Sequence, residues 1–272
     1  HTLFPNIACV TSTDSDHLDI YNSEQELKKS FIQFTDNIKS KGLLFSNEKT
    51  LLGGISYGFS SESEYFISNY SSAKYSSFFD INHNGSLIAS VKFNMHGKHN
   101  ALNALAAFAI GKELNIDYKS IINSLSTFLG VKRRFSYALR LPKIIIDDYA
   151  HHPSEIKAVY DTIKDLYPNK KNTAIFQPHL YTRTRDFMPE FAEILSKFDN
   201  IILTEIYPAR EKPITNISSI KLLELIKNKN KFILKKSELS KSLKESKSEV
   251  FVIMGAGDIA DEVELIKNNI LN

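Results

Sequence analysis

The chain has 272 residues, enough for two domains, and its 42% hydrophobic and 24% charged residues are typical of a globular protein. A net charge of +3 gives no argument for nucleic acid, and no apolar run approaches the roughly 20 residues that span a bilayer. We therefore expect neither a nucleic-acid nor a membrane partner. The single cysteine, Cys9, excludes an internal disulfide and favours a reducing compartment, most simply the cytoplasm.

The first part of the chain, residues 1 to about 131, predicts an α+β domain or an incomplete α/β domain. It opens without Met on "HTLFPNIACV", already strand-like, so we expect a fragment of a longer protein. A predicted amphipathic helix at residues 23–39 is followed by alternating Ser, Tyr and Phe over residues 42–93, which indicate strands joined by turns. Two further predicted helices, "HNALNALAAFAIGKEL" and "YKSIINSLSTFL", close this part.

From about residue 132 onward, short apolar runs alternate regularly with helical patterns. The pairs begin with "KIIID" before "SEIKAVYDTIKDLY" and "NTAIF" before "RDFMPEFAEILSKF", and they end with "EVFVIM" before "DIADEVELIKNN". Strands that are apolar throughout and separated by helices are typical of a parallel sheet covered on both faces. The sequence therefore predicts an open α/β domain over residues 132–272.

Polar loops follow most of the predicted strands of this second part. They read "DDYAHHP", "QPHLYTRTR", "EIYPAREKP" and "GAGD". Ligands of parallel α/β sheets bind at the carboxyl ends of the strands, so these loops are expected to share one rim and form a site.

In the first loop, the carboxylates of Asp147 and Asp148 are followed by Tyr149 and the imidazoles of His151 and His152, and a carboxylate beside an imidazole can orient it and raise its basicity. The simpler interpretation is a helix cap by His152 or Ser154. The second loop offers His179, Arg183 and Arg185, and arginine binds phosphate or carboxylate oxygens in pairs. Alternatively, each arginine only solvates its loop.

Three motifs outside the predicted sheet also carry candidate ligands. "DSDHLD" places His17 among carboxylates, which suits a metal, although an exposed acidic turn is the commoner explanation. "GKHNALNAL" places His99, Asn100 and Asn103 at a helix start, where they could bind a heterocycle or where Asn100 could be an ordinary N-cap. "GVKRRF" adds Arg133 and Arg134 near the predicted junction, where a nucleotide phosphate could lie.

Seven motifs of the chain, taken in order, resemble those of the Mur ligases over essentially its whole length. They are "TSTDSDHLDIY", "GKHNALNALAA", "GVKRRF", "DDYAHHPSEI", "FQPHLYTRTRDF", "EIYPAREKPI" and "MGAGDI". The resemblance is greatest to the branch that adds L-alanine to UDP-N-acetylmuramate in peptidoglycan precursor synthesis. The alternative within the family is the muropeptide-recycling branch, which carries different loops in place of "QPHLYTRTR". No G-x-x-x-x-G-K-[ST] motif occurs in the chain.

The resemblance implies that residues 1–131 are the later part of a central ATP-binding domain, and that residues 132–272 are a complete Rossmann-like third domain. The first domain, the phosphate-binding loop and a Mg²⁺-binding glutamate would then lie upstream. We expect the fragment alone to be inactive, and a monomer or homodimer.

The implied reaction uses ATP and Mg²⁺ to convert the lactyl carboxylate into an acyl phosphate, which the amine of L-alanine attacks. In the first part of the chain, the resemblance implies that His17 is a Mg²⁺ ligand and that His99, Asn100 and Asn103 recognise adenine. It implies that Arg134 binds the ATP phosphates and that Asp148, Tyr149 and His151 form a loop facing nucleotide and substrate. It also implies that His179, Arg183 and Arg185 bind the acyl group and the amino acid.

Two positions depart from patterns in the family. Leu180 stands where an arginine often follows the histidine, and Ile32 stands in the register of a carbamylated lysine used by ligases that add later amino acids. The second departure fits the alanine-adding branch. Outside the family, "DDYAHH" with "DSDHLD" is also compatible with a two-metal phosphohydrolase that would not use ATP.

Overall fold

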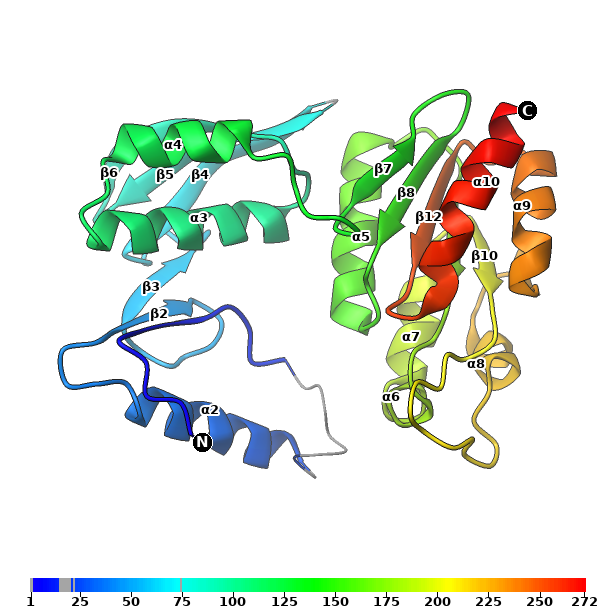
Figure 1. Ribbon diagram of the computed structural model, residues 1–272, viewed down its shortest axis with the longest axis horizontal. Helices are drawn as coiled ribbons and strands as arrows, with labels where there is room; N and C mark the ends of the chain where they lie inside the picture. The colour runs from blue at the N-terminus through cyan, green and yellow to red at the C-terminus, as the bar shows by residue number, and fades with distance from the viewer. Residues whose placement is uncertain (1, 15–20, 22, 74) are drawn as a thin grey trace. The chain divides into compact units, whose positions relative to one another are not determined.

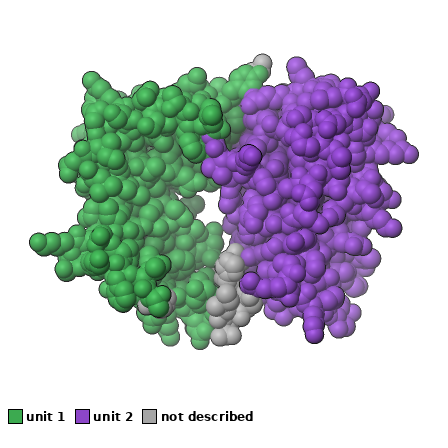
Figure 2. Space-filling view, in the orientation of Figure 1, with its two compact units in different colours: residues 1–129 green, residues 130–272 purple. Residues whose placement is uncertain are grey.

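The computed structural model describes residues 2–14, 21, 23–73 and 75–272. The chain divides into two compact units, His1–Leu129 and Gly130–Asn272, coloured green and purple in Figure 2. Each unit has its own sheet and its own hydrophobic core. Among the described residues, no helix is both long and apolar enough to cross a membrane.

The first unit is built on a mixed six-stranded sheet whose strands follow chain order (Figure 1). The first four strands pair in parallel and the last two are antiparallel. The strands are β1 (Ile7–Val10), β2 (Leu43–Asn47), β3 (Ile55–Gly58), β4 (Tyr65–Ala73), β5 (Ser76–His83) and β6 (Ser86–Phe93), and the helices are α2 (Glu24–Asp36), α3 (Lys98–Glu113) and α4 (Tyr118–Thr127).

Local sequence explains the elements of this unit. Ser23 caps α2 and Asp117 caps α4, each by accepting a hydrogen bond from a backbone N–H in the first turn. Asn84 and Gly85 both have positive φ, as the tight turn between β5 and β6 requires. The α3 helix packs on β3, β4 and β5, and its buried Leu105 and Phe108 join Phe45 and Ile81 in the core.

The second unit is an open α/β sheet with strand order β11-β10-β9-β12-β8-β7. All strands are parallel except the edge strand β7, which is antiparallel to β8. The strands are β7 (Ser136–Leu139), β8 (Ile144–Asp148), β9 (Asn172–Phe176), β10 (Asn200–Leu203), β11 (Lys231–Ile233) and β12 (Val250–Met254). The helices are α5 (Pro153–Leu166), α6 (Tyr181–Asp186), α7 (Met188–Leu195), α8 (Ser219–Leu225), α9 (Lys236–Glu245) and α10 (Glu262–Leu271), with a 3₁₀ turn η1 (Asp258–Asp261).

Helices cover both faces of this sheet, as the apolar strands predict. Alternate residues of β8 enter different cores: Ile146 packs with α5, α7 and α8, whereas Ile145 packs with α9 and α10. Every residue of β9 and β12 is buried. The predicted α/β fold class is therefore confirmed.

Two details of the second unit differ from the sequence expectation. The helix predicted over "RDFMPEFAEILSKF" is interrupted at Phe187, between α6 and α7, because Pro189 near the start of α7 cannot donate its backbone hydrogen bond to the preceding turn. The short strand β7 was not predicted. Its residues are only partly buried, so the sequence lacks the continuous apolar run seen in the parallel strands.

Candidate active site at the strand ends of the second unit

Asp148, the last residue of β8, is buried and organises the turn that follows it. Its Oδ2 accepts the backbone N–H of Phe135 at 2.7 Å, and its Oδ1 accepts that of Ala150 at 2.8 Å. Burial raises the pKa of Asp148 to about 6, although the two hydrogen bonds oppose the rise. Because both oxygens contact the backbone, Asp148 holds the loop in place.

Arg133 is fixed against the same turn. Its guanidinium donates to the carbonyl of Gly255, after β12, and its Nε lies 3.6 Å from Asp147 Oδ1. Burial raises the pKa of Asp147, and the charge of Arg133 opposes that rise. The guanidinium carbons of Arg133 and Arg134 lie 4.8 and 5.7 Å from the ring centre of Tyr149, within the range of cation–π contacts.

Glu155 on α5 positions the histidine pair of the first loop. One of its oxygens, Oε2, accepts the backbone N–H groups of His151 at 2.8 Å and His152 at 3.1 Å, and lies 3.2 Å from the imidazole Nδ1 of His151. The same Nδ1 lies 2.9 Å from the carbonyl of Tyr149. His152 is the N-cap of α5 and forms a capping box with Glu155. Of the two caps left open by the sequence, the structure therefore selects His152.

The loop after β9 brings a second imidazole to this rim. The rings of His179 and Tyr207 are nearly parallel with centres 5.7 Å apart, and the rings of His151 and His179 are 6.0 Å apart. Arg183, on α6, is buried with its guanidinium 3.2 Å from His179 Nδ1. Arg183 therefore contacts His179, whose ring lies near that of His151, and side chains of these types can bind negatively charged oxygens.

The backbone around His179 is held by groups that sequence reasoning missed. Leu180 has a φ of 69°, and its N–H donates to the carbonyl of Tyr207 at 2.9 Å. Glu211 accepts hydrogen bonds from the backbone N–H groups of Tyr181 at 2.6 Å and Thr182 at 3.1 Å, so it satisfies backbone donors in the first turn of α6. Glu211 lies in the quoted "EIYPAREKP" loop, but no local pattern indicates that it would contact α6.

A cavity of about 440 Å³ lies beside this rim and is lined by Gln177, Thr204, Glu205, Lys235, Lys236, Ser237 and Glu262. Gln177 donates to Asp258 Oδ1 at 2.8 Å, and Lys236 Nζ contacts Asp258 Oδ2 at 2.5 Å. Burial raises the pKa of Asp258, but these two hydrogen bonds, the charge of Lys236 and a backbone hydrogen bond together lower it below its usual value. Gly257 is required here because a Cβ would lie 2.5 Å from Tyr207 Cγ.

Comparisons with known proteins identify the family to which the chain belongs. Residues 1–111 match the family model described as the Mur ligase middle domain, and residues 133–257 match the one described as the Mur ligase, glutamate ligase domain. The chain belongs to the Mur ligase family. The two matches lie one within each compact unit.

Two curated relatives of this Mur ligase chain carry the same name. The protein called UDP-N-acetylmuramate–L-alanine ligase in Christiangramia forsetii is 45% identical to this chain over 99% of the chain. The protein of the same name in Flavobacterium psychrophilum is 46% identical to it over 98% of the chain. The chain spans 60% of the length of each. A crystal structure of UDP-N-acetylmuramate–alanine ligase from Thermotoga maritima is 29% identical with a TM-score of 0.78, over 97% of this chain and 59% of that one.

The structure places the predicted residues of this Mur ligase chain as follows. Tyr149, His151, His179 and Arg183 come together at one rim of the second unit. Arg185 is half exposed and pairs with Asp186 through a 2.7 Å contact.

Arg134 is exposed and lies 3.5 Å from Glu155. In the first unit, Asn100 is buried and donates to the carbonyl of His96 at 2.7 Å, His99 is half-buried and Asn103 is exposed. Gly97, and not Asn100, is the N-cap of α3. His17 lies outside the described residues.

Proposed function

We propose that this chain is part of an ATP-dependent ligase that joins L-alanine to UDP-N-acetylmuramate. The observation that carries the proposal is the 45% identity to a ligase of that name along 99% of the chain. The rim of the second unit supports it, because Arg183 and two imidazoles gather where acyl and phosphoryl oxygens need neutralising. Dependence on ATP and a nucleotide sugar supports a cytoplasmic location.

In this proposal, residues 1–131 form the later part of the ATP-binding middle domain and residues 132–272 form the Rossmann-like third domain. A carboxylate oxygen of the sugar attacks the γ-phosphorus of ATP and ADP leaves, which gives an acyl phosphate. The amine of L-alanine then attacks the acyl carbon. The bond from that carbon to the bridging oxygen breaks, so phosphate leaves carrying one oxygen of the original carboxylate.

The buried guanidinium of Arg183 is the group best placed to neutralise the oxygens of the acyl phosphate and of the tetrahedral intermediate. It needs little rearrangement, because its contact with His179 already holds it. His151, oriented by Glu155 and the Tyr149 carbonyl, is the candidate base that takes a proton from the attacking amine.

For the nucleotide, the exposed face of Tyr149 with Arg134 beside it fits an anionic, planar ligand. In the first unit, Asn103 and His99 are accessible to a base, whereas Asn100 binds its own backbone and orients the start of α3. The proposal for Mg²⁺ rests on His17, which lies outside the described residues, so no step is assigned through the metal.

The proposal is tested with a chimera in which the N-terminal part of the Christiangramia forsetii ligase, up to the matched region, precedes residue 1. We expect phosphate release from ATP only when UDP-N-acetylmuramate and L-alanine are both present. The chain by itself should release none, because its sequence contains no G-x-x-x-x-G-K-[ST] loop for the ATP phosphates.

Release with a free cell-wall peptide, which carries an unblocked α-amine, in place of L-alanine would instead indicate a recycling ligase. Metal-dependent hydrolysis of a simple phosphate ester without ATP would indicate a phosphohydrolase. Either result from a folded chimera would contradict the proposal.

A further inference from the structure

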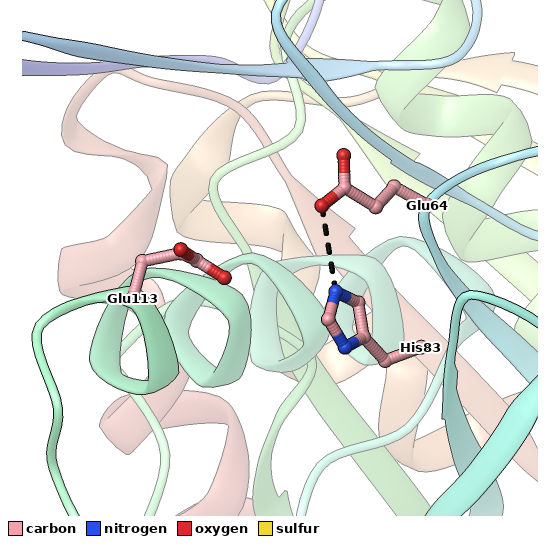
Figure 3. Close-up of side chains that lie close together, drawn as sticks. All are labelled: Glu64, His83 and Glu113. Atoms are coloured by element: carbon pink, nitrogen blue, oxygen red, sulfur yellow. Dashed lines mark hydrogen bonds and ion pairs between the residues drawn. The ribbon is translucent and has the colours of Figure 1, made fainter.

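Three side chains that can bind a metal converge in the first unit, and none of them belongs to a motif used above. Glu64 directly precedes β4, His83 is the last residue of β5, and Glu113 is the last residue of α3. One ligand atom from each lies within 4.8 Å of the other two, and His83 Nε2 is 3.4 Å from Glu64 Oε1. Figure 3 shows the carboxylates of Glu64 and Glu113 directed toward the imidazole from two sides.

Tyr65 holds two members of this triad in position. Its fully buried ring stacks on His83, with centres 4.2 Å apart and planes 17° apart, and its hydroxyl donates to Glu113 Oε1 at 2.7 Å. Hydrogen bonds of this kind orient the ligands of metal sites and leave the second carboxylate oxygen available.

The charges of the triad favour a cation between its members. Two carboxylates this close repel each other, and within the described part of the chain no lysine or arginine forms an ion pair with Glu64 or Glu113. A protonated His83 would pair with the near carboxylate of Glu64, but a divalent cation would serve both carboxylates and the imidazole nitrogen together.

We propose that Glu64, His83 and Glu113 form a binding site for a divalent first-row transition metal, represented here by Zn²⁺. One imidazole and two carboxylates suit Zn²⁺ or Mn²⁺ better than Mg²⁺, which prefers oxygen ligands. Zinc lies about 2.0–2.2 Å from such ligands, so the carboxylates must turn inward. The side chain of Glu64, 36% exposed, has the freedom to do so, and this exposure admits water to complete the coordination.

The bound metal would join the β4–β5 pair to the C-terminal end of α3. Since α3 packs on the face of that sheet, the site would fasten the two layers of the first unit together. This role is structural and does not depend on the ligase reaction.

The test is a Zn²⁺ titration of the chelator-treated full chain against a chromophoric competitor, without ligase substrates. We expect one tight site in the wild type and a rise in melting temperature on adding Zn²⁺. His83→Gln and Glu113→Gln should each weaken binding at least about tenfold and abolish the thermal shift. Glu62→Gln, which changes an exposed carboxylate on the same turn, is the matched control and should change neither.

His17→Gln removes the metal ligand that the sequence predicted, and the tight site should survive it. Circular dichroism without metal checks that each variant folds. If His83→Gln does not fold, Glu64→Gln replaces it, because among the described residues the hydrogen bond and ion pair of the partly exposed Glu64 carboxylate are both with His83. No tight Zn²⁺ binding in the wild type, or binding that Glu64→Gln and Glu113→Gln leave unchanged, would overturn the proposal.

Discussion

At the residue scale, the polar and aromatic side chains between Asp147 and His152 fall into two groups. Some hold the backbone of the turn and others remain at the rim. Asp148 and His152 bind the backbone of their own turn, while Tyr149 and His151 remain at the rim. The sequence indicated that so many polar residues were more than a cap, but the same residue types serve both purposes. Only their hydrogen-bond partners, which depend on Phe135 and Glu155, distinguish them.

The buried carboxyl of Asp148 predicts a specific dependence of stability on pH. Its folded pKa of about 6 exceeds the ordinary 3.8, so between these values the folded chain holds a proton that the unfolded chain has lost. Its contribution to the free energy of unfolding therefore falls as pH rises through this window, by on the order of 2–3 kcal/mol.

Asp148→Asn should remove this component, although its amide also loses one backbone hydrogen bond at every pH. Urea unfolding at pH 4.5 and pH 7 measures the effect, and the difference between the wild type and the variant cancels the contributions of other groups. Equal pH dependence in both proteins would show that Asp148 is not a buried, titrating group.

Arg183 and Arg185 are predicted to differ, although sequence reasoning treated them alike. Arg183 is buried against His179, whereas Arg185 is half exposed beside Asp186. In the chimera, Arg183→Lys should lower kcat/KM at least about tenfold because lysine cannot reproduce the planar fork. Arg185→Lys should cost less than about threefold, since an exposed pair contributes little. Equal losses would mean that both arginines contact the substrate.

At the scale of elements, the sequence predicted the alternating strands and helices of the second unit but not how the helices end. In the Lys-rich run after residue 226, Lys231 Nζ donates to the carbonyls of Leu223 and Ile226, where α8 ends. Lys143 acts similarly at the end of α9, with bonds of 2.7–2.8 Å to three carbonyls. Such contacts are distant in sequence, so composition alone cannot show them.

Lys143→Met is expected to destabilise the chain by about 1–2 kcal/mol, because the last carbonyls of α9 lose their donor and a favourable charge. Lys241→Met, at an exposed position of the same helix, is the control and should stay within about 0.5 kcal/mol. Urea unfolding of both variants measures the difference. A control as destabilised as Lys143→Met would show that the carbonyl contacts are not the cause.

At the scale of the whole molecule, the sequence predicted two parts of different texture, and the chain forms two compact units. The rim of the second unit was predictable because parallel strands bring their carboxyl ends to one edge. The triad of Glu64, His83 and Glu113 was not, because its members lie on three elements far apart in sequence and belong to no motif.

The central claim is that the completed enzyme activates a carboxylate through an acyl phosphate. The most direct measurement supplies the chimera with UDP-N-acetylmuramate labelled with ¹⁸O in its carboxylate, together with ATP and L-alanine, and analyses the released phosphate by mass spectrometry. The account predicts one ¹⁸O atom in each phosphate, because the acyl carbon–oxygen bond breaks when the amine displaces phosphate. Phosphate without the label would show that water, and not the carboxylate, had received the phosphoryl group, and would contradict the ligase assignment.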